Sequence, residues 1–143
     1  MGSEISPQEG IIYLMVIMSA ADREMNDQEL AKMGRLTRYL PIFEAFEEED
    51  LLPTTRRCSA ILAEPEGLSH ALQAIQEAIP ERLYDTAYAV AVDLASADLN
   101  VRVEEIRILQ LVRDIFKLDK LTCAAIERGA IARFRRARSS ERD

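Results

Sequence analysis

Two acidic segments of this chain repeat each other at a spacing of 76 positions. The first starts with Ala21 and Asp22, and the second starts with the same two residues at Ala97 and Asp98. In each copy a glutamate follows seven positions after the aspartate, and the flanking apolar positions repeat as well. Leu14, Met18, Met25, Leu30, Met33, Leu36 and Leu40 correspond to Val90, Leu94, Val101, Ile106, Leu109, Val112 and Phe116. The pattern predicts two helical hairpins of one plan, with an Asp where the first helix of each ends and a Glu in the first turn of its second.

Apolar residues at three- and four-residue spacing predict an all-α bundle of about seven helices. No stretch longer than five residues alternates cleanly between apolar and polar, so no strand is expected. Breaks are expected at Pro41, at 64–67, at Pro80 and at 118–120. The helix over about 80–97 carries small residues suited to tight contacts, which favours it as the central helix, and the last helix is expected over about 121–138.

The helix starts have recognisable capping residues. Ser6 can cap the first helix, Pro7 suits its first position, and Glu9 is placed to bond back to the backbone of Ser6. Asn26 or Asp27 is expected to cap the second helix.

The size and composition are those of one globular domain. The chain has 143 residues, of which 48% are apolar and 30% charged, enough to bury one hydrophobic core. We therefore expect a single domain over 1–143, with flexible ends at about 1–6 and 139–143.

Charge is spread unevenly along the chain. Residues 125–143 hold six Arg against three acids, so the net charge of −7 divides into +3 for this tail and −10 for the rest. An acidic body repels polyanions, which excludes nucleic acid as the expected partner. Two interpretations of the tail stay open: an ordinary last helix whose Arg residues complement its negative end, with Leu118, Leu121, Ile126 and Phe134 in the core, or a helix in peripheral contact with an anionic membrane.

The residues that carry nucleophilic or redox chemistry are few. Cys58 and Cys123 stand 65 positions apart without a CxxC motif, which is typical of buried thiols in a reducing compartment. With no leader-like segment and no apolar run of bilayer length, this predicts a cytoplasmic protein. His70 is the single histidine and is expected on a polar helix face, and no motif of a nucleophilic or nucleotide-binding enzyme occurs. We expect no enzymatic activity.

The acidic segments are candidate metal sites, because dense carboxylates suit Ca²⁺, Mg²⁺ or Mn²⁺. An EF-hand is excluded, since neither the glycine nor the final glutamate of that loop falls in place. The alternative is structural: the acids cap the helices that follow them. A hydrolase with paired carboxylates is the least favoured function. The candidate metal ligands are Asp22, Glu24, Glu29, Asp98 and Glu105.

The two segments resemble the TerB-like tellurite-resistance family, which is related to the N-terminal domain of DjlA-type co-chaperones. That family has two Ala-Asp-Gly turns, each followed by Glu and an apolar residue. Ala21-Asp22 with Glu29-Leu30 and Ala97-Asp98 with Glu105-Ile106 match, although Arg23 and Leu99 replace the glycines. The resemblance covers about 11–134. It implies a non-catalytic helical bundle that is linked to tellurite and chemical stress and binds divalent metal through acids such as Asp22 and Asp98. We expect a binding module for a protein partner, with a divalent cation as the alternative ligand and no other cofactor.

Overall fold

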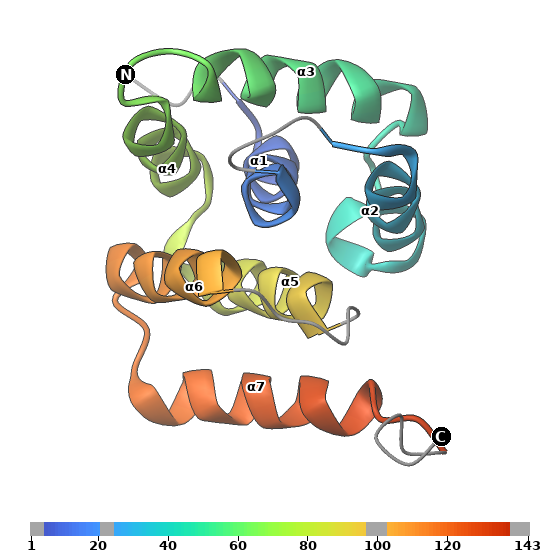
Figure 1. The fold of residues 1–143 in the computed structure, drawn as a ribbon, viewed down its shortest axis with the longest axis vertical. Coiled ribbons are helices and arrows are strands. Elements are labelled where there is room, and N and C mark those ends of the chain that lie inside the picture. Colours follow the sequence, from blue (N-terminus) through green and yellow to red (C-terminus); the bar gives the residue numbers. More distant parts are fainter. Residues whose placement is uncertain (1–4, 21–24, 97–102, 138–143) are drawn as a thin grey trace.

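The computed structural model describes residues 5–20, 25–96 and 103–137, and these residues form an all-α bundle without strands (Figure 1). The predicted fold class is confirmed. None of the described helices is long and apolar enough to cross a membrane. The α-helices are α1 (Pro7–Ala20), α2 (Asp27–Tyr39), α3 (Leu51–Leu62), α4 (Gly67–Ala78), α5 (Tyr84–Ser96), α6 (Val103–Phe116) and α7 (Lys120–Arg133). Short 3-10 turns are η1 (Pro41–Phe43), η2 (Glu48–Asp50) and η3 (Glu81–Leu83).

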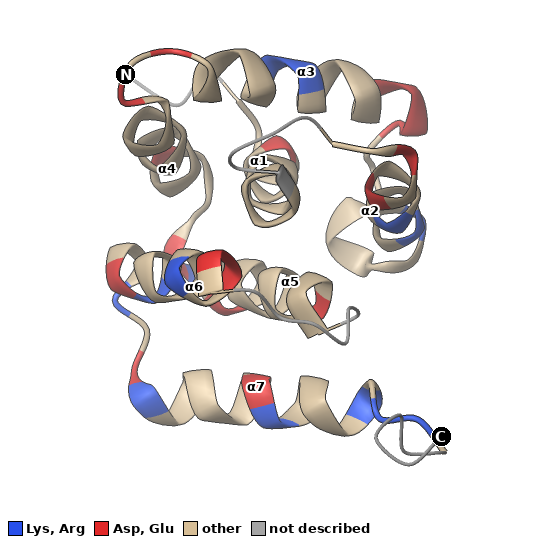
Figure 2. Cartoon of the chain, viewed as in Figure 1, with Lys and Arg blue, Asp and Glu red and all other residues tan. Residues whose placement is uncertain are grey.

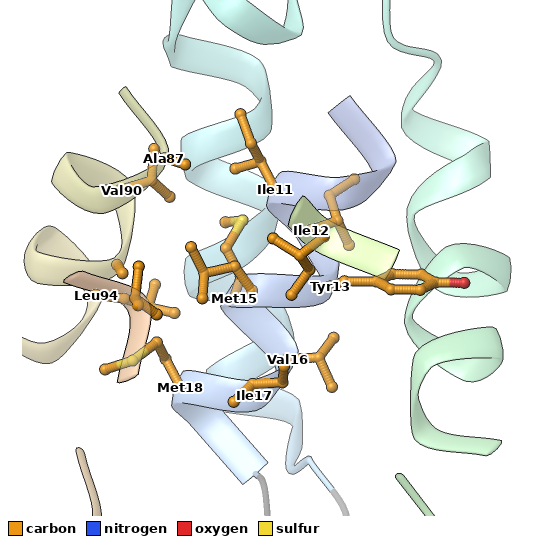
Figure 3. Packing of buried hydrophobic residues seen from close by; sticks show 14 of the residues in the cluster. Ile11, Ile12, Tyr13, Met15, Val16, Ile17, Met18, Ala87, Val90 and Leu94 are labelled. Atoms are coloured by element: carbon orange, nitrogen blue, oxygen red, sulfur yellow. The ribbon is translucent and has the colours of Figure 1, made fainter. Parts of the chain in front are cut away.

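Helix α1 is the centre of the bundle. Every residue from Ile11 to Met18 is buried, and a helix that is apolar on all sides must be covered on all sides. Helices α3, α4 and α5 pack around it, and Figure 3 shows Met18 directed toward Leu94 of α5 while Tyr13 points to the opposite side. The prediction that the helix over 80–97 is central is therefore wrong, because its small residues serve close packing on α1, α6 and α7 rather than complete burial.

Helix α5 lies between α1 and α7, against both of which it packs (Figure 1). The contact surface of α7 includes Cys123 and Ala130, which are buried. Leu121 is 79% exposed and Phe134 is 38% exposed, so the prediction that both belong to the core is wrong. Since α7 packs mainly on α5, only one narrow stripe of its surface is covered.

The capping prediction for α1 is confirmed. The backbone N–H of Glu9 donates to Ser6 Oγ at 3.1 Å, and the backbone N–H of Ser6 donates to Glu9 Oε1 at 2.8 Å. Arg57 of α3 also donates to Glu9. The box therefore starts α1 and joins it to α3.

Two predicted boundaries differ from the structure. Helix α5 begins at Tyr84 rather than at Pro80, because η3 occupies the residues between them. Helix α7 ends at Arg133 rather than near residue 138.

The described helices flank both copies of the sequence repeat. Helix α1 is described up to Ala20 and α2 begins at Asp27, while α5 is described up to Ser96 and α6 from Val103. The two acidic segments therefore lie at equivalent places in the chain, each between a helix that precedes it and a helix that follows it.

Candidate functional site

The first candidate site leads into α2, whose start is fixed by a second capping box. Asn26 is the N-cap: its Oδ1 accepts from the backbone N–H of Glu29 at 2.8 Å, and Glu29 Oε1 accepts from the backbone N–H of Asn26 at 3.0 Å. The Glu29 carboxylate is thus engaged in a structural role. Asp22 and Glu24, the other candidate ligands of this segment, lie outside the described residues.

The second candidate site leads into α6. Glu105 lies in its first turn and is only 8% exposed, whereas the neighbouring Glu104 is exposed. The corresponding Glu29 is half-buried and lies at the surface end of its helix. The two copies therefore place equivalent glutamates in different environments, and Asp98 lies outside the described residues.

A metal centre is not assembled by the described part of the chain alone. Within 5–20, 25–96 and 103–137, no group of three or more His, Cys, Asp or Glu side chains is placed to hold a metal ion. Of the five candidate ligands, Glu29 and Glu105 fall in these ranges and the other three do not. Metal binding by the acidic connections stays a prediction.

The thiol of Cys58 lies in an unreactive environment. Cys58 is fully buried and its Sγ donates to the backbone carbonyl of Tyr13 at 3.7 Å. Burial raises the pKa of the thiol to about 12, so it is protonated at neutral pH and a poor nucleophile. His70 is exposed on α4, as the sequence predicted.

A polar cluster that sequence reasoning missed joins α5, α6 and α7. Tyr88 is buried on α5 and its hydroxyl donates to Glu127 Oε2 on α7, which also accepts from Arg113 Nη1 on α6 at 3.2 Å. Burial and then the Glu127 carboxylate raise the pKa of Tyr88. The sequence held one signal for this cluster, because Tyr88 stands on a helix face of small apolar residues. A buried tyrosine usually needs a hydrogen-bond partner, so a polar residue on a neighbouring helix could have been expected.

A cavity of about 320 Å³ opens beside this cluster. Its floor is formed by α5, and its two walls are formed by α6 and α7. We name it the α6–α7 groove, and it is lined by Tyr88, Val92, Ala95, Ser96, Ile106, Leu109, Arg113, Glu127 and Ile131.

A second cavity, of about 440 Å³, lies between the segment 40–42 and α5. Its lining is mostly apolar, and Asp93 is the one charged residue among those that line it. Asp93 is paired with Arg133 of α7. Neither of these two cavities is lined by Glu29 or Glu105, the candidate ligands that lie among the described residues.

Comparison of the chain with known protein families, with curated proteins and with solved structures finds no match. The likeness to TerB-like proteins therefore rests on the residues of the two acidic segments and remains a prediction. The structure establishes the arrangement of the described helices. The role of the acidic connections is proposed below.

Proposed function

We propose that this protein is a non-catalytic binding module of TerB-like type that acts through its two acidic inter-helix connections, 21–26 and 97–102. The observation that carries the proposal is the sequence repeat, in which Asp98 and Glu105 recur 76 positions after Asp22 and Glu29, each copy standing between two helices. A repeated acidic segment between helices indicates a duplicated unit rather than two unrelated loops.

The capping geometry at α2 supports a binding role for Asp22. A purely structural interpretation assigns Asp22 to the free N–H groups at the start of this helix. Asn26 occupies the N-cap position and Glu29 completes the capping box, so the start of α2 does not depend on Asp22. The proposal therefore assigns Asp22 to a protein partner rather than to the cap of α2.

The environments of Cys58 and His70, the two residue types best suited to nucleophilic catalysis, also support a module without enzymatic activity. The thiol of Cys58 is buried and protonated, and His70 is exposed on α4. A nucleophilic mechanism needs an activated nucleophile beside a base. The resemblance to TerB-like proteins indicates that the proposed function belongs to the response to chemical stress, including tellurite.

A divalent cation is the alternative ligand of the same connections. Oxygen donors from Asp22, Glu24 and Asp98 suit Ca²⁺, Mg²⁺ or Mn²⁺, and an ion held by them would raise the stability of the folded state. This alternative is favoured by the density of carboxylates at equivalent places in the two connections.

The proposal is tested with the double variant Asp22→Asn/Asp98→Asn. Its matched control is Glu47→Gln/Glu49→Gln, which removes two exposed carboxylates outside the repeat. Affinity capture should lose its partners with the first variant and keep them with the control. Unchanged partners in Asp22→Asn/Asp98→Asn would refute the binding role of the connections.

Calorimetric titration separates the two ligand classes. If a cation is the ligand, Ca²⁺, Mg²⁺ or Mn²⁺ should release or absorb heat with the wild type and raise its melting temperature, and both effects should vanish in Asp22→Asn/Asp98→Asn. No heat and no shift in melting temperature at millimolar cation would rule out the cation and leave the protein partner.

A further inference from the structure

The α6–α7 groove is a concave surface with a mostly apolar lining that also holds the ion pair between Arg113 and Glu127. Its floor includes Tyr88 and Val92 of α5. Ile106 of α6 and Ile131 of α7 line opposite walls, and both side chains are about half exposed, at 46% and 49%. An isoleucine on each side of an open groove leaves apolar surface in contact with water, which costs free energy unless a partner covers it.

Most of the exposed large apolar side chains lie on the helices that form the two walls of this groove. Of the seven large hydrophobic residues that are exposed in the described part of the chain, five belong to α6, to α7 or to the residue that follows α7. These five are Val103, Ile106, Leu121, Ile131 and Phe134. Ile106 and Ile131 line the groove itself, and a partner seated in it would cover both.

The same region is the basic part of an acidic protein. Residues 103–137 hold eight basic and five acidic side chains, a net charge of +3, which leaves −10 for the rest of the chain. Figure 2 shows Lys and Arg at both ends of α7. Arg128, Arg135 and Arg136 are exposed, and the side chain of Arg113 in the groove wall is one-third exposed. An acidic partner is attracted here and repelled by the rest of the molecule.

The shape of the groove decides between the acidic partners that this charge would attract. A flat membrane surface can touch the rims of α6 and α7, but it cannot reach the floor on α5. A helix is about 10 Å across and can lay its apolar face into a hydrophobic groove between two helices. We propose that the α6–α7 groove binds an acidic amphipathic helix of a partner protein, with its apolar face between Ile106 and Ile131 and its carboxylates facing the arginines.

In the proposed complex Arg113 donates a hydrogen bond to a carboxylate of the partner helix. One of its nitrogens, Nη1, donates to Glu127, and a guanidinium has five N–H donors in all. A carboxylate of the partner helix that lies against Arg113 gains a charge-assisted hydrogen bond at the edge of the apolar contact. The residues that line the groove are not those of the acidic connections on which the proposed function rests.

The test uses a synthetic helix as its probe. The probe carries Leu at positions i, i+3, i+4 and i+7, Glu at the other positions and a fluorescent label, and its counterpart carries Lys in place of Glu. Fluorescence anisotropy with the full chain should show binding of the Glu probe that weakens as salt is added, and no comparable binding of the Lys probe. Equal affinity for the two probes would overturn the proposal.

Two wall variants and a matched control locate the site. Ile106→Ser and Ile131→Ser should each weaken binding of the Glu probe by roughly tenfold, because each removes an anchor from one wall. Leu52→Ser removes a side chain of similar exposure, 41%, from α3 and should leave the affinity unchanged within about twofold. These half-exposed substitutions are expected to fold, which circular dichroism and melting temperature verify. An unchanged affinity in both wall variants refutes the groove.

A vesicle-binding experiment tests the alternative that the basic surface contacts an anionic membrane. Phosphatidylcholine vesicles with and without phosphatidylserine are mixed with the same proteins in a flotation assay. The proposal expects no flotation with either composition under conditions where the Glu probe binds. Flotation with phosphatidylserine and no binding of the Glu probe would assign the basic surface to a membrane and overturn the proposed helix partner.

Discussion

The hydroxyl of Tyr88 on α5 donates a hydrogen bond to the carboxylate of Glu127 on α7. Arg113 of α6 donates to the same carboxylate oxygen at 3.2 Å, so three helices meet at one acceptor. A second ion pair, between Arg133 of α7 and Asp93 of α5, lies farther along the same pair of helices. Helix α7 is therefore attached to α5 by polar contacts in addition to a narrow apolar stripe.

Replacing Tyr88 by Phe should lower the free energy of unfolding by about 1–2 kcal/mol, because a hydrogen bond to a charged acceptor is lost while the ring still packs. Urea denaturation followed by circular dichroism measures the change. Tyr39→Phe is the control, since Tyr39 is 80% exposed and its variant should stay within about 0.5 kcal/mol of the wild type. Equal stability of the two variants would show that the Tyr88 hydroxyl does not stabilise the contact between α5 and α7.

Cys58 and Cys123 should resist thiol reagents in the folded protein. Both are buried, and burial raises the pKa of Cys58 to about 12 and also raises that of Cys123. Because the thiolate is the reacting species, labelling at pH 8 should be slow in buffer and rapid in denaturant. Ellman's reagent measures both rates, and prompt release of one equivalent from the native protein would contradict the burial of that thiol.

Two helical glycines should respond to alanine in opposite ways. A Cβ on Gly34 of α2 would meet only the end of Arg38 at 3.4 Å and Leu51 at 3.9 Å, so Gly34→Ala should stabilise the protein by up to about 1 kcal/mol through helix propensity. A Cβ on Gly10 of α1 would lie 3.1 Å from both Ala78 and Ile79.

Gly10→Ala should therefore lower stability by about 1–2 kcal/mol, since the packed contact between α1 and α4 has to separate. Thermal and urea denaturation of the two variants measure the sign as well as the size of each effect. The close approach of α1 and α4 would be disproved by a Gly10→Ala protein as stable as the wild type.

Glu9 should contribute to the acid sensitivity of the fold. Burial alone would raise the pKa of Glu9, but the hydrogen bonds from the Ser6 backbone and from Arg57 outweigh it and hold the pKa below its ordinary value of 4.5. A pKa that is lower in the folded state means that ionised Glu9 stabilises the protein above about pH 4.5, and that this stabilisation is lost as pH falls through the lower value.

Glu9→Gln should consequently be less stable than the wild type at pH 7, and the difference should shrink as pH falls below 4.5. Urea denaturation of both proteins between pH 7 and pH 3 provides the comparison. A difference that stays constant over this range would mean that the carboxylate is not the group responsible.

The elements that local rules describe were predicted well. The capping box at Ser6 was predicted, and so was a cap for α2 at Asn26 or Asp27, because the groups that meet are three positions apart in the chain. The repeat similarly placed each acidic segment between two helices. These features need no knowledge of which helix packs on which.

The features that depend on packing were harder to predict. The central place of α1 is visible in the unbroken apolar run from Ile11 to Met18, all of it buried, but the small residues of the helix over 80–97 favoured that helix as the central one. The contact between Tyr88 and Glu127 joins residues 39 positions apart. Nothing local couples them, so their meeting follows only from the docking of α7 on α5. The α6–α7 groove was missed for the same reason.

The capping box of α2 allows the structural and binding roles of the first acidic connection to be separated. Asn26→Ala removes the side chain that accepts from the Glu29 backbone at 2.8 Å and should lower stability by about 1 kcal/mol. Asn26→Asp keeps an acceptor at the N-cap and should retain most of this stability. If Asp22 serves a ligand, Asn26→Ala should keep the captured partners while Asp22→Asn/Asp98→Asn loses them at little cost in stability. Differential scanning calorimetry and affinity capture on the same variants measure both properties, and a large loss of stability in Asp22→Asn/Asp98→Asn would instead assign these aspartates to the fold.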